Sequence, residues 1–560
     1  MPETENVAAR PAEVHDVDVD VVVVGAGFAG MYLVVRCRAA GLSVVVLEAG
    51  TDVGGTWYWN RYPGARCDVV SMEYSYSFSS ELEQEWDWTE AMAAQPEILR
   101  YARHVADRFD LRRDIRFSTR VTSAAFEESA DRWTVRTDRG DRITARHCVM
   151  ATGCLSAANL PDIPGRDTFT GRLLHTGNWP KEPVDLSGRV GVIGTGSSGV
   201  QAIPVIAEEA AHLTVFQRTP TFTFPANNRP MKPEIAAAYK EHYREVREAQ
   251  KWSAAGMSGF SPSRGTTILQ RGERRSDTPS EPRLLAALDA DERRAAWDRL
   301  GFGIFTYFKD VYRDPVANEY ACALYRDHIR SVVADPATAE ALTPVGYPVG
   351  CKRQVLDTRF YETFNRPNVD VVDIAADPIT TITPDGVRTA RRHIELDTLV
   401  FATGFDAMTG ALDRIDVAGR SGTRLRDYWA EGPRTYLGLQ VAGFPNLFTV
   451  TGPGSPSVLA NVIVAIEQHV DWIVDTIVDL DARGMRTIET TAEAEARWGA
   501  HVNEVAAGTM YTAPTCASWY LGANIEGKPR QFLPYVGGFA RYRATCDRVR
   551  TEGYDGFVLT

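Results

Sequence analysis

The sequence predicts an α/β protein built from two Rossmann-like dinucleotide-binding domains, with a helical insertion in the second of them. Glycine-rich turns lie at 25–30 and 194–199, and each follows an apolar strand and precedes a helical stretch. Apolar strands of this kind are buried in parallel sheets, and the turn after them carries the dinucleotide fingerprint. A charged segment with helical periodicity interrupts the second unit. The chain has 560 residues, long enough for several domains, and its 44% hydrophobic content is ordinary for a globular protein.

The first unit opens with a nearly continuous valine run at 17–24, which predicts a buried strand. In the turn, Gly25 allows a tight bend, Gly27 lets backbone N–H groups approach a pyrophosphate, and Gly30 lets the helix pack close to the sheet. The next apolar strand ends in Glu48, whose carboxylate can accept both ribose hydroxyls of an adenosine. This correctly spaced acid favours cofactor binding over an ordinary glycine-rich turn.

A second unit of the same kind has its strand at 189–193. Its turn repeats the glycine spacing over Gly194, Thr195, Gly196, Ser197, Ser198 and Gly199. The strand that closes this unit ends in Arg218 and Thr219, where the first unit has an acid. A carboxylate there would repel a 2′-phosphate, whereas Arg218 would attract it and Thr219 would add a hydroxyl donor. We therefore predict NADPH at the second site, against the alternative that Arg218 is a solvated surface residue.

The region after the second unit changes character. Residues 232–252 are charged and helical in period, and residues 253–280 are rich in Gly, Ser, Pro and Arg. This composition predicts inserted helices with a mobile loop. Sheet-like patterns return at 369–373 and 398–401, and one long helix is expected at 457–480.

Two further strand ends share the pattern Ala-Thr-Gly, at 151–153 and 402–404. Small residues there let the backbone pass close to a bound cofactor. Together with the two turns, this pattern resembles flavoproteins in which an FAD domain faces an NAD(P) domain. The run 54–68 adds glycines and aromatic rings suited to packing against a flat ring system, with Asp68 as its only acid. The loop at 347–353 supplies two cations, which on their own would indicate a solvated loop.

These patterns predict two interleaved domains. The expected division is a disordered leader at 1–16, an FAD-binding domain at 17–160 and 391–560 that includes substrate-site loops, a linker at 161–187, an NADP-binding domain at 188–230 and 331–390, and a helical insertion at 231–330. The insertion is the part whose role is least evident, and it leaves the shape of a substrate entrance open.

Bulk properties exclude several classes of partner. The net charge of -12 argues against nucleic-acid and anionic-membrane binding, which favour basic surfaces. The eight cysteines form no C-x-x-C pair, so neither a redox dithiol nor a zinc site is expected, and no other metal is indicated. Isolated cysteines in a long chain indicate reduced thiols inside the cell. The first residues show no signal-peptide pattern, so we expect a soluble cytoplasmic protein.

Two motifs in the chain are specific enough to indicate a family. The pattern F-x-G-x-x-x-H-x-x-x-W-P is met by Phe169, Gly171, His175, Trp179 and Pro180. A second pattern is met by Gly54, Gly55, Trp57, Tyr62, Pro63, Gly64 and Asp68. With these motifs the chain resembles the Baeyer–Villiger monooxygenases, flavin- and NADPH-dependent enzymes that insert oxygen beside a ketone. The similarity covers nearly the whole chain and is greatest to phenylacetone- and steroid-type members, through the runs 452–461 and 517–524.

The resemblance implies roles for individual residues. Arg353 would be catalytic with Asp68 as its partner, Lys352 would assist at the 2′-phosphate, Trp519 would touch the nicotinamide ribose, and His175 would shape the linker and domain motion. FAD would be bound by Gly25, Gly27, Phe28, Gly30, Glu48, Gly55, Thr56, Trp57, Trp59, Asp68 and Tyr74. NADPH would be bound by residues 194–199 with Arg218, Thr219, Lys352 and Trp519. The ketone pocket would include Ser455, Pro456, Ser457, Val458 and Leu459.

The reaction implied by the resemblance uses NADPH and O2 to convert a bulky or cyclic ketone into an ester or lactone through a C4a-peroxyflavin, in a monomeric enzyme. The fixed charge of Arg353 would keep the peroxide deprotonated and stabilise the oxyanion adduct. An N- or S-oxygenating flavin monooxygenase is the nearest alternative, and it shares the glycine turns without the Trp-Pro ending. A non-catalytic flavin-binding protein would not need a second nucleotide site. A disulfide reductase would need the C-x-x-C that the chain lacks.

Overall fold

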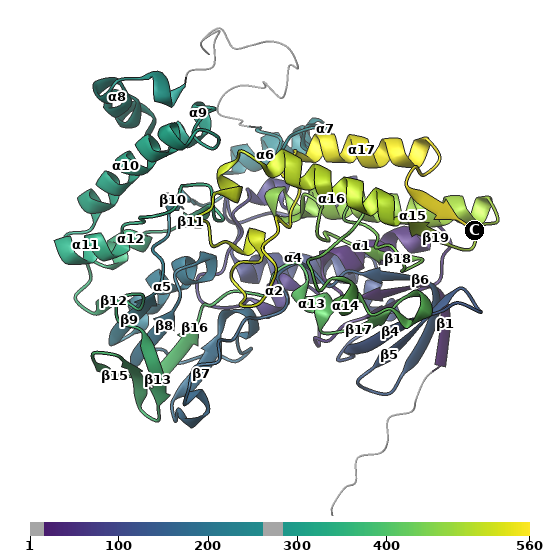
Figure 1. Ribbon diagram of the computed structural model, residues 1–560, viewed down its shortest axis with the longest axis horizontal. Helices are drawn as coiled ribbons and strands as arrows, with labels where there is room; N and C mark the ends of the chain where they lie inside the picture. Colours follow the sequence, from purple (N-terminus) through teal and green to yellow (C-terminus); the bar gives the residue numbers. More distant parts are fainter. Residues whose placement is uncertain (1–15, 261–283) are drawn as a thin grey trace, which may run out of the picture.

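A computed structural model describes residues 16–260 and 284–560 (Figure 1). The predicted leader at 1–16 lies outside the described residues except for Asp16, which begins the first strand, and the loop at 253–280 is described only as far as residue 260. The chain forms two lobes, each around its own sheet with a parallel core. The predicted α/β class with two Rossmann-like units is confirmed.

The first sheet starts from the N-terminal valine run. Strand β1 (Asp16–Val24) pairs in parallel with β2 (Val44–Leu47) and with β6 (Arg142–Met150). The strand order is β17-β4-β5-β6-β1-β2-β3, and β18 also pairs with β6. The other strands are β3 (Ile115–Arg116), β4 (Val121–Glu127), β5 (Arg132–Thr137), β17 (Asp416–Ala418) and β18 (Leu447–Thr449). Because β17 and β18 come from far along the chain, the C-terminal part completes the sheet that the N-terminal part begins.

Two helices meet on this sheet. Helix α1 (Phe28–Ala39) follows the first turn and packs against α15 (Val462–Ala482). The hydroxyl of Tyr32 and the guanidinium of Arg36 donate to the carboxylate of Asp471 at 2.8 and 2.6 Å. The apolar face of α15 thus reaches the core while its polar face is tied to α1.

The start of α15 differs from the helix predicted at 457–480. Residues Ser457–Leu459 form a separate 3₁₀ turn, η9, and α15 begins at Val462. The side chain of Asn461 accepts a hydrogen bond from the backbone N–H of Ile463 at 3.2 Å and caps the helix there. The predicted start was therefore too early, and η9 is free to project its backbone toward the space between the lobes.

The second sheet has the order β12-β9-β8-β16-β7, all parallel. Its strands are β7 (Arg172–His175), β8 (Arg189–Ile193), β9 (His212–Gln217), β12 (Val369–Asp373) and β16 (Thr398–Phe401). The strand β7 comes from the segment at 161–187 that was expected to be a linker. The strand β16 lies beyond the domain boundary expected at 391. The return to the first sheet therefore comes after Phe401, and that expected boundary was too early.

The inserted helices divide between the lobes. Helices α6 (Pro233–Glu241) and α7 (Tyr243–Lys251) pack on the first lobe, where Arg247 pairs with Glu83 at 2.7 Å and both side chains are buried. The later helices extend along the outer edge beside the second sheet (Figure 1). These are α8 (Ala290–Leu300), α9 (Ile304–Tyr307), α10 (Pro315–Val332), α11 (Pro336–Leu342) and α12 (Phe360–Thr363).

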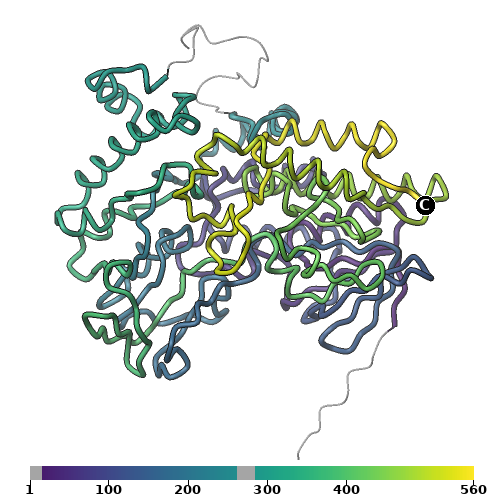
Figure 2. The backbone as a smooth tube through the Cα atoms, in the orientation of Figure 1, coloured from purple at the N-terminus to yellow at the C-terminus, as the bar shows by residue number. Residues whose placement is uncertain are grey.

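The C-terminal part returns across the centre of the molecule, as the yellow-green tube shows (Figure 2). Within the described ranges, no helix combines the length and the apolar character needed to cross a membrane. The remaining helices are α2 (Thr56–Trp59), α3 (Ser80–Glu85), α4 (Gln95–Arg108), α5 (Ser197–Glu209), α13 (Gly410–Asp413), α14 (Leu425–Tyr428), α16 (Ala492–Ala506) and α17 (Phe539–Thr551). The remaining strands are β10 (Thr223–Pro225), β11 (Val355–Asp357), β13 (Ile379–Thr383), β14 (Gly386–Thr389), β15 (His393–Glu395), β19 (Ile488–Thr490) and β20 (Phe557–Leu559).

Candidate active site

The first glycine turn has no room for side chains at two of its positions. Gly25 has a φ of +106°, and a Cβ built on it would lie 2.6 Å from the carbonyl oxygen of Ala151, at the first Ala-Thr-Gly strand end. A Cβ on Gly30 would lie 1.9 Å from the carbonyl oxygen of Gly25. These contacts hold the N-terminus of α1 against the sheet, where its backbone N–H groups form an anion site.

A second backbone segment covers this turn. The N–H of Gly54 donates to the carbonyl oxygen of Ala26 at 3.1 Å, and a Cβ on Gly55 would lie 2.9 Å from the Cα of Gly27. The carboxylate of Glu48, at the end of β2, is buried and accepts the N–H groups of Ala26 and Gly50 at 2.7 and 2.6 Å. Burial raises the pKa of Glu48. Each carboxylate oxygen keeps a lone pair for a ribose hydroxyl, so this closed cradle fits the adenosine diphosphate part of FAD.

Aromatic rings continue the cradle toward the centre. The indole N–H of Trp57 donates to the hydroxyl of Tyr74 at 3.1 Å, and the two rings meet edge to face. Phe28, Trp57 and Tyr74 are buried, Trp59 is half-buried and Thr56 is exposed. These rings come from α1, α2 and the segment before α3, so three elements build one apolar wall.

The second glycine turn repeats the geometry of the first. Gly194 has a φ of +107°, and its Cβ would lie 2.6 Å from the carbonyl oxygen of Ala402, at the second Ala-Thr-Gly strand end. A Cβ on Gly199 would lie 2.2 Å from the carbonyl oxygen of Gly194. This turn is open within the described part of the chain, because Gly196 is exposed and a Cβ on it would meet no heavy atom within 4 Å apart from its chain neighbours. Ser197 is also exposed and Ser198 is half-buried.

The end of β9 presents positive charge. Gln217 turns inward and donates to the carbonyl oxygen of Ala341 at 2.7 Å, whereas Arg218 is exposed. The carbonyl oxygen of Thr219 accepts a bond at 3.2 Å from the hydroxyl of Thr195, the second residue of the turn. The end of β9 is thereby tied to the glycine turn, so its cation lies beside an open anion site.

Lys352 adds a second positive charge near Arg218. The ammonium of Lys352 lies 4.6 Å from the ring centroid of Tyr347. Burial and the charge of Arg218 lower the pKa of Lys352 to about 8. Two cations that repel one another are the donor set that a 2′-phosphate needs, so these residues fit NADPH.

The next residue forms an ion pair between the lobes. The guanidinium of Arg353, just before β11, bonds the carboxylate of Asp68 from the first lobe and donates to the carbonyl oxygen of Val458 in η9 at 2.6 Å. Each side chain of the pair is 31% exposed, so the pair faces an open space. The charge of Asp68 raises the pKa of Arg353, which keeps the guanidinium charged at any working pH. Three distant segments therefore converge on one fixed positive charge.

Within the predicted ketone-pocket run 455–459, the carbonyl oxygen of Val458 accepts a hydrogen bond from Arg353 at 2.6 Å. Ser455, Pro456 and Ser457 are buried, and the hydroxyl of Ser455 donates to the carbonyl oxygen of Gly452 at 2.7 Å. Val458 and Leu459 are half-buried. The assignment of these residues to the ketone pocket stays a prediction.

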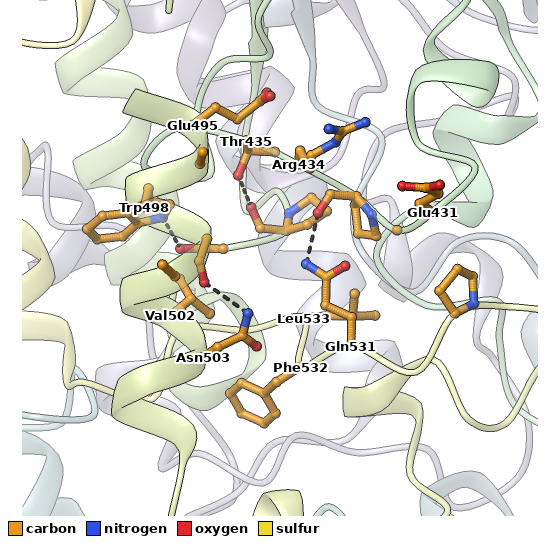
Figure 3. Close-up of a pocket in the computed structure, with 18 of the residues that line it drawn as sticks. Glu431, Arg434, Thr435, Glu495, Trp498, Val502, Asn503, Gln531, Phe532 and Leu533 are labelled. Atoms are coloured by element: carbon orange, nitrogen blue, oxygen red, sulfur yellow. Dashed lines mark hydrogen bonds between the residues drawn. The ribbon is translucent and has the colours of Figure 1, made fainter. Parts of the chain in front are cut away.

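The larger of two described cavities has a volume of about 570 Å³ and lies beside residues 507–538, the C-terminal loop between α16 and α17 (Figure 3). Its lining includes Thr435, Trp498, Asn503, Gln531 and Leu533. Neither Arg353 nor the run 455–459 lines it. A smaller cavity does include Lys352 and Arg353. The larger cavity is thus separate from the ion pair.

The C-terminal loop meets the Arg353 loop through a disulfide. Cys351 and Cys516 are bonded, with their Cα atoms 5.7 Å apart. Trp519 and Tyr520 follow on the short turn η11 (Trp519–Leu521), where Trp519 is half-buried and its ring centroid lies 4.3 Å from that of Tyr520, with the two rings tilted at 53°. The prediction that all eight cysteines are reduced is therefore wrong for this pair. The two positions are 165 residues apart, and their spacing alone carried no sign of the contact.

The residues of the histidine motif, at 169–180, have structural roles in this fold. His175 ends β7, where its Nδ1 accepts the N–H of Gly177 at 2.9 Å and its Nε2 lies 3.3 Å from the carbonyl oxygen of Asn159. Burial lowers the pKa of His175, so the neutral ring donates to Asn159. The Nε2 atom also lies 3.3 Å from the hydroxyl of Thr403, at the end of β16. The ring therefore joins the segment after β6 to the second sheet.

The ends of the motif pack in the same way. A Cβ on Gly171 would lie 2.5 Å from the carbonyl oxygen of Asp397 and 2.6 Å from the ring of Phe169, so only glycine fits. The N–H of Trp179 donates to the carbonyl oxygen of Trp59 in α2 at 3.4 Å. Trp179 is buried beside the half-buried Pro180. The motif thus runs from the second sheet back to the first lobe.

Gln201, which the sequence did not single out, joins the lobes on their other side. From α5 it accepts the hydroxyl of Tyr62 at 2.8 Å and donates to the carbonyl oxygen of Arg66 at 3.1 Å. A Cβ on Gly64 would lie 2.2 Å from the carbonyl oxygen of Gln201. The second family pattern therefore includes a docking surface for α5. A glutamine on a helix has no sequence signature, so only the fold could reveal it.

Comparisons with known proteins agree with this architecture. A family model described as pyridine nucleotide-disulphide oxidoreductase matches residues 22–258. The chain is 41% identical to a Baeyer–Villiger monooxygenase from Pseudooceanicola batsensis, over 99% of this chain and 98% of that protein. It is 40% identical to a phenazine N-monooxygenase from Lysobacter antibioticus, over 96% and 97%. A solved structure of an oxidized steroid monooxygenase bound to NADP is 50% identical, with a TM-score of 0.87 over 97% of this chain and 99% of that one.

Proposed function

Because this chain belongs to the Baeyer–Villiger monooxygenase family, we propose that Arg353 and Asp68 form the charged centre of its reaction. The protein is a flavoprotein monooxygenase that uses FAD and NADPH and converts a ketone to an ester or lactone. When bound, NADPH supplies electrons and FAD activates oxygen. The residues of the chain hold these cofactors, place the ketone and stabilise the charge that develops on its oxygen.

The convergence of three segments on the guanidinium of Arg353 carries the proposal. Asp68 and the carbonyl oxygen of Val458 orient the guanidinium, and its raised pKa keeps the charge in place. A preorganised cation stabilises an oxyanion without the reorganisation that water would need. Arg353 therefore faces the reacting oxygen, and Asp68 acts as its positioning partner from the first lobe.

The substitution Arg353→Ala tests this role. Ester formation should fall by about 10²–10³-fold, the usual loss when one oxyanion donor is removed. Consumption of NADPH without ketone should continue, because Arg218 and Lys352 are intact. Arg353→Lys keeps a charge but cannot span both partners, so it should retain part of the activity. Ester formed by Arg353→Ala at near the wild-type rate, measured by mass spectrometry, would overturn the proposal.

The two cofactors should use different residues. We assign FAD to the closed cradle of Gly25, Gly30, Glu48 and Gly55, with the aromatic wall beyond it. We assign NADPH to the open second turn, with the 2′-phosphate between the two cations at the end of β9 and before β11. Trp519 lies three residues after Cys516, which is bonded to Cys351 of the Arg353 loop, and we propose it as the contact for the nicotinamide ribose. The FAD content of Gly30→Ala tests the first assignment, and KM for NADPH in Gly196→Ala and Arg218→Ala tests the second.

We propose a bulky or cyclic ketone as substrate. Relatives named for cyclohexanone and cyclopentanone are 38% and 36% identical to this chain, and the solved steroid monooxygenase is 50% identical. Val458, whose carbonyl oxygen bonds Arg353, and the next residue, Leu459, have half-buried apolar side chains that we propose as contacts for the ketone. A panel of cyclic, steroidal and short linear ketones, analysed for ester products, tests the proposal. Preference for acetone, the substrate named for a relative at 38% identity, would overturn it.

N-oxidation is a second candidate, favoured by the phenazine N-monooxygenase at 40% identity. The two reactions differ in their need for a cation. An amine or aromatic nitrogen donates its electron pair to oxygen, so no oxyanion forms on the substrate. Arg353→Ala should therefore abolish ester formation while leaving most of any N-oxide formation. Equal loss of both products would show that Arg353 acts before the two reactions diverge.

The cellular setting is part of the proposal. We propose that the protein works in the cytoplasm as a monomer on a small-molecule ketone and O2, without nucleic-acid or membrane partners. Its net charge of -12 and the lack of a membrane-spanning helix in the described ranges support this. Light scattering at working concentration tests the oligomeric state, and cell fractionation tests the compartment.

A further inference from the structure

We propose that Cys351 and Cys516 form a reversible redox site that ties the C-terminal loop to the Arg353 loop and thereby controls how much NADPH oxidation is coupled to product. The proposal rests on the role assigned to Arg353 above. It makes the disulfide a switchable part of the active site, and the peroxide of uncoupled turnover its oxidant.

The position of the bond carries the proposal. Cys351 lies two residues before Arg353, and Cys516 lies three residues before Trp519. Both cysteines are buried, at 0% and 1% exposure. The bond therefore couples the guanidinium to the segment that carries Trp519 with no flexible spacer. Movement of one loop must move the other as long as the bond exists.

The noncovalent contacts between the C-terminal loop and the Arg353 loop are less direct than the disulfide. The guanidinium of Arg530 donates to the carbonyl oxygens of Cys516 and Ala513 at 2.6 and 3.0 Å, so the loop is braced by its own later residues. The N–H of Met510 donates to the carbonyl oxygen of Tyr312 at 3.0 Å, and the side-chain amide of Gln354, next to Arg353, donates to the hydroxyl of Tyr312. Without the disulfide, the bonds of Arg530 would keep the loop folded, while its link to the Arg353 loop would depend on such indirect contacts and would loosen.

A cavity lies directly behind this loop. The space of about 570 Å³ shown in Figure 3 is lined by Thr512, Leu521 and Arg530, which flank the segment around Cys516. Room on that side allows the loop to move back once the bond is broken. More water would then reach Arg353, and water in a monooxygenase site diverts activated oxygen to H2O2.

The chemistry balances with H2O2 as the oxidant. One thiolate attacks a peroxide oxygen, the O–O bond breaks, and a sulfenic acid and water form. The second sulfur then attacks the sulfenic sulfur, the S–O bond breaks, the S–S bond forms, and a second water leaves. In total, two thiols and one H2O2 give one disulfide and two waters. The peroxide released by an open site therefore restores the bond that closes it. A small-molecule thiol reverses the bond by exchange: one thiol attacks the S–S bond, a second attacks the mixed disulfide, and two protein thiols and the disulfide of the small thiol result.

A thiol count tests the bond itself, independently of activity. Full-length enzyme purified without reductant is denatured and alkylated before and after reduction, and its mass is measured. We expect six alkylated cysteines before reduction and eight after it, since six are free in the structure. Peptide mapping should place the two extra labels on Cys351 and Cys516. Eight labels before reduction that H2O2 treatment does not lower to six would overturn the proposal.

Coupling tests the function of the bond. Wild-type enzyme is compared in its reduced and reoxidised forms, which needs no substitution. The ratio of H2O2 to ester should rise by about threefold to tenfold in the reduced form, as small misplacements of reacting groups cost large factors. Cys516→Ser should keep the high ratio after oxidation. Cys322→Ser, at an equally buried free cysteine in α10, should behave as wild type.

The outcomes separate this proposal from the one on which it rests. A disulfide that forms reversibly but leaves the ratio of H2O2 to ester unchanged would overturn the control role while leaving Arg353 untouched. If Arg353→Ala keeps full ester formation, the role of Arg353 fails, and the thiol count still reports whether the bond exists.

Discussion

The two glycine turns differ in what covers them, although their own geometry is nearly the same. Gly25 and Gly194 have φ values of +106° and +107°, and each would clash with a carbonyl oxygen of an Ala-Thr-Gly strand end at 2.6 Å. The first turn is closed by the segment at 54–55, whereas the second is open at Gly196. The closed turn suits a cofactor that stays through every cycle, and the open turn suits one that enters and leaves. The shared glycine spacing therefore sets the local fold of both turns. We expect the residues around each turn to set how long its cofactor stays bound.

The largest effect should come from filling the closed turn. Gly30→Ala would place a methyl group 1.9 Å from the carbonyl oxygen of Gly25, and neither backbone can retreat. We expect loss of bound FAD and a cost at or above the upper end of the ~1–3 kcal/mol typical of overpacking. Flavin absorbance per protein measures the result.

The matched control lies in the open turn. Gly196→Ala meets no protein atom within 4 Å, so FAD content and folding should stay at wild-type levels. Its methyl group would still face an approaching pyrophosphate, so KM for NADPH should rise. Normal FAD content in Gly30→Ala, or lost FAD in Gly196→Ala, would break the comparison between the two turns.

The next largest effect concerns the strand ends. Arg218→Ala removes the exposed cation at the end of β9, where the first unit has the buried Glu48. We expect kcat/KM for NADPH to fall about tenfold, in line with ~1.5 kcal/mol for a charged hydrogen bond at an exposed site. The value for NADH should not change, because NADH has no 2′-phosphate. Equal losses with both coenzymes would place Arg218 elsewhere in the site.

A smaller effect follows from the pKa of Lys352, lowered to about 8 by burial and the charge of Arg218. Below that pH the ammonium is charged and attracts the 2′-phosphate, and above it the neutral amine does not. The profile of kcat/KM for NADPH, which reports the free enzyme, should therefore fall as pH rises through about 8. Lys352→Arg should flatten the profile, since arginine stays charged. A wild-type profile that is flat from pH 7 to about 9 would contradict this assignment.

Sequence patterns correctly predicted the parts of the fold that depend on local periodicity. The strands at 189–193, 369–373 and 398–401 were predicted with the bounds that they have. The membership of β7 and β16 in the second sheet was missed, because strand pairing is set by contacts between distant segments. The same limit applies to the bond between Cys351 and Cys516, which residue types alone could not show.

The same limit applies to the candidate active site, because its contacts join segments that are distant in the sequence. Arg353 and Asp68 were named through family resemblance, and their contact across 285 positions is a property of the fold. The run 455–459 was predicted to line the pocket, and within it Ser455, Pro456 and Ser457 are buried whereas Val458 and Leu459 are half-buried. Backbone direction at η9 decides which side chains face the space, and no periodic pattern encodes a single 3₁₀ turn.

The smallest predicted effect tests how the two lobes are held together. Gln201 on α5 bonds Tyr62 and Arg66 of the first lobe, so Gln201→Ala removes three neutral hydrogen bonds, each worth about 1 kcal/mol or less. We expect a fall in Tm of a few degrees and a slower transfer of electrons from NADPH to FAD, because that step needs both lobes in register. Transfer is measured as the rate of flavin bleaching under anaerobic conditions.

The control for Gln201 is a glutamine whose bond stays within one lobe. Gln531 donates to the carbonyl oxygen of Pro433 at 3.0 Å, and both residues belong to the C-terminal part. Gln531→Ala should lower Tm by a similar or smaller amount and leave the rate of flavin reduction unchanged. If Gln201→Ala lowers Tm without slowing that rate, the bonds to Tyr62 and Arg66 only add stability. The register of the two cofactors would then depend on the histidine motif, which joins the lobes at Trp179.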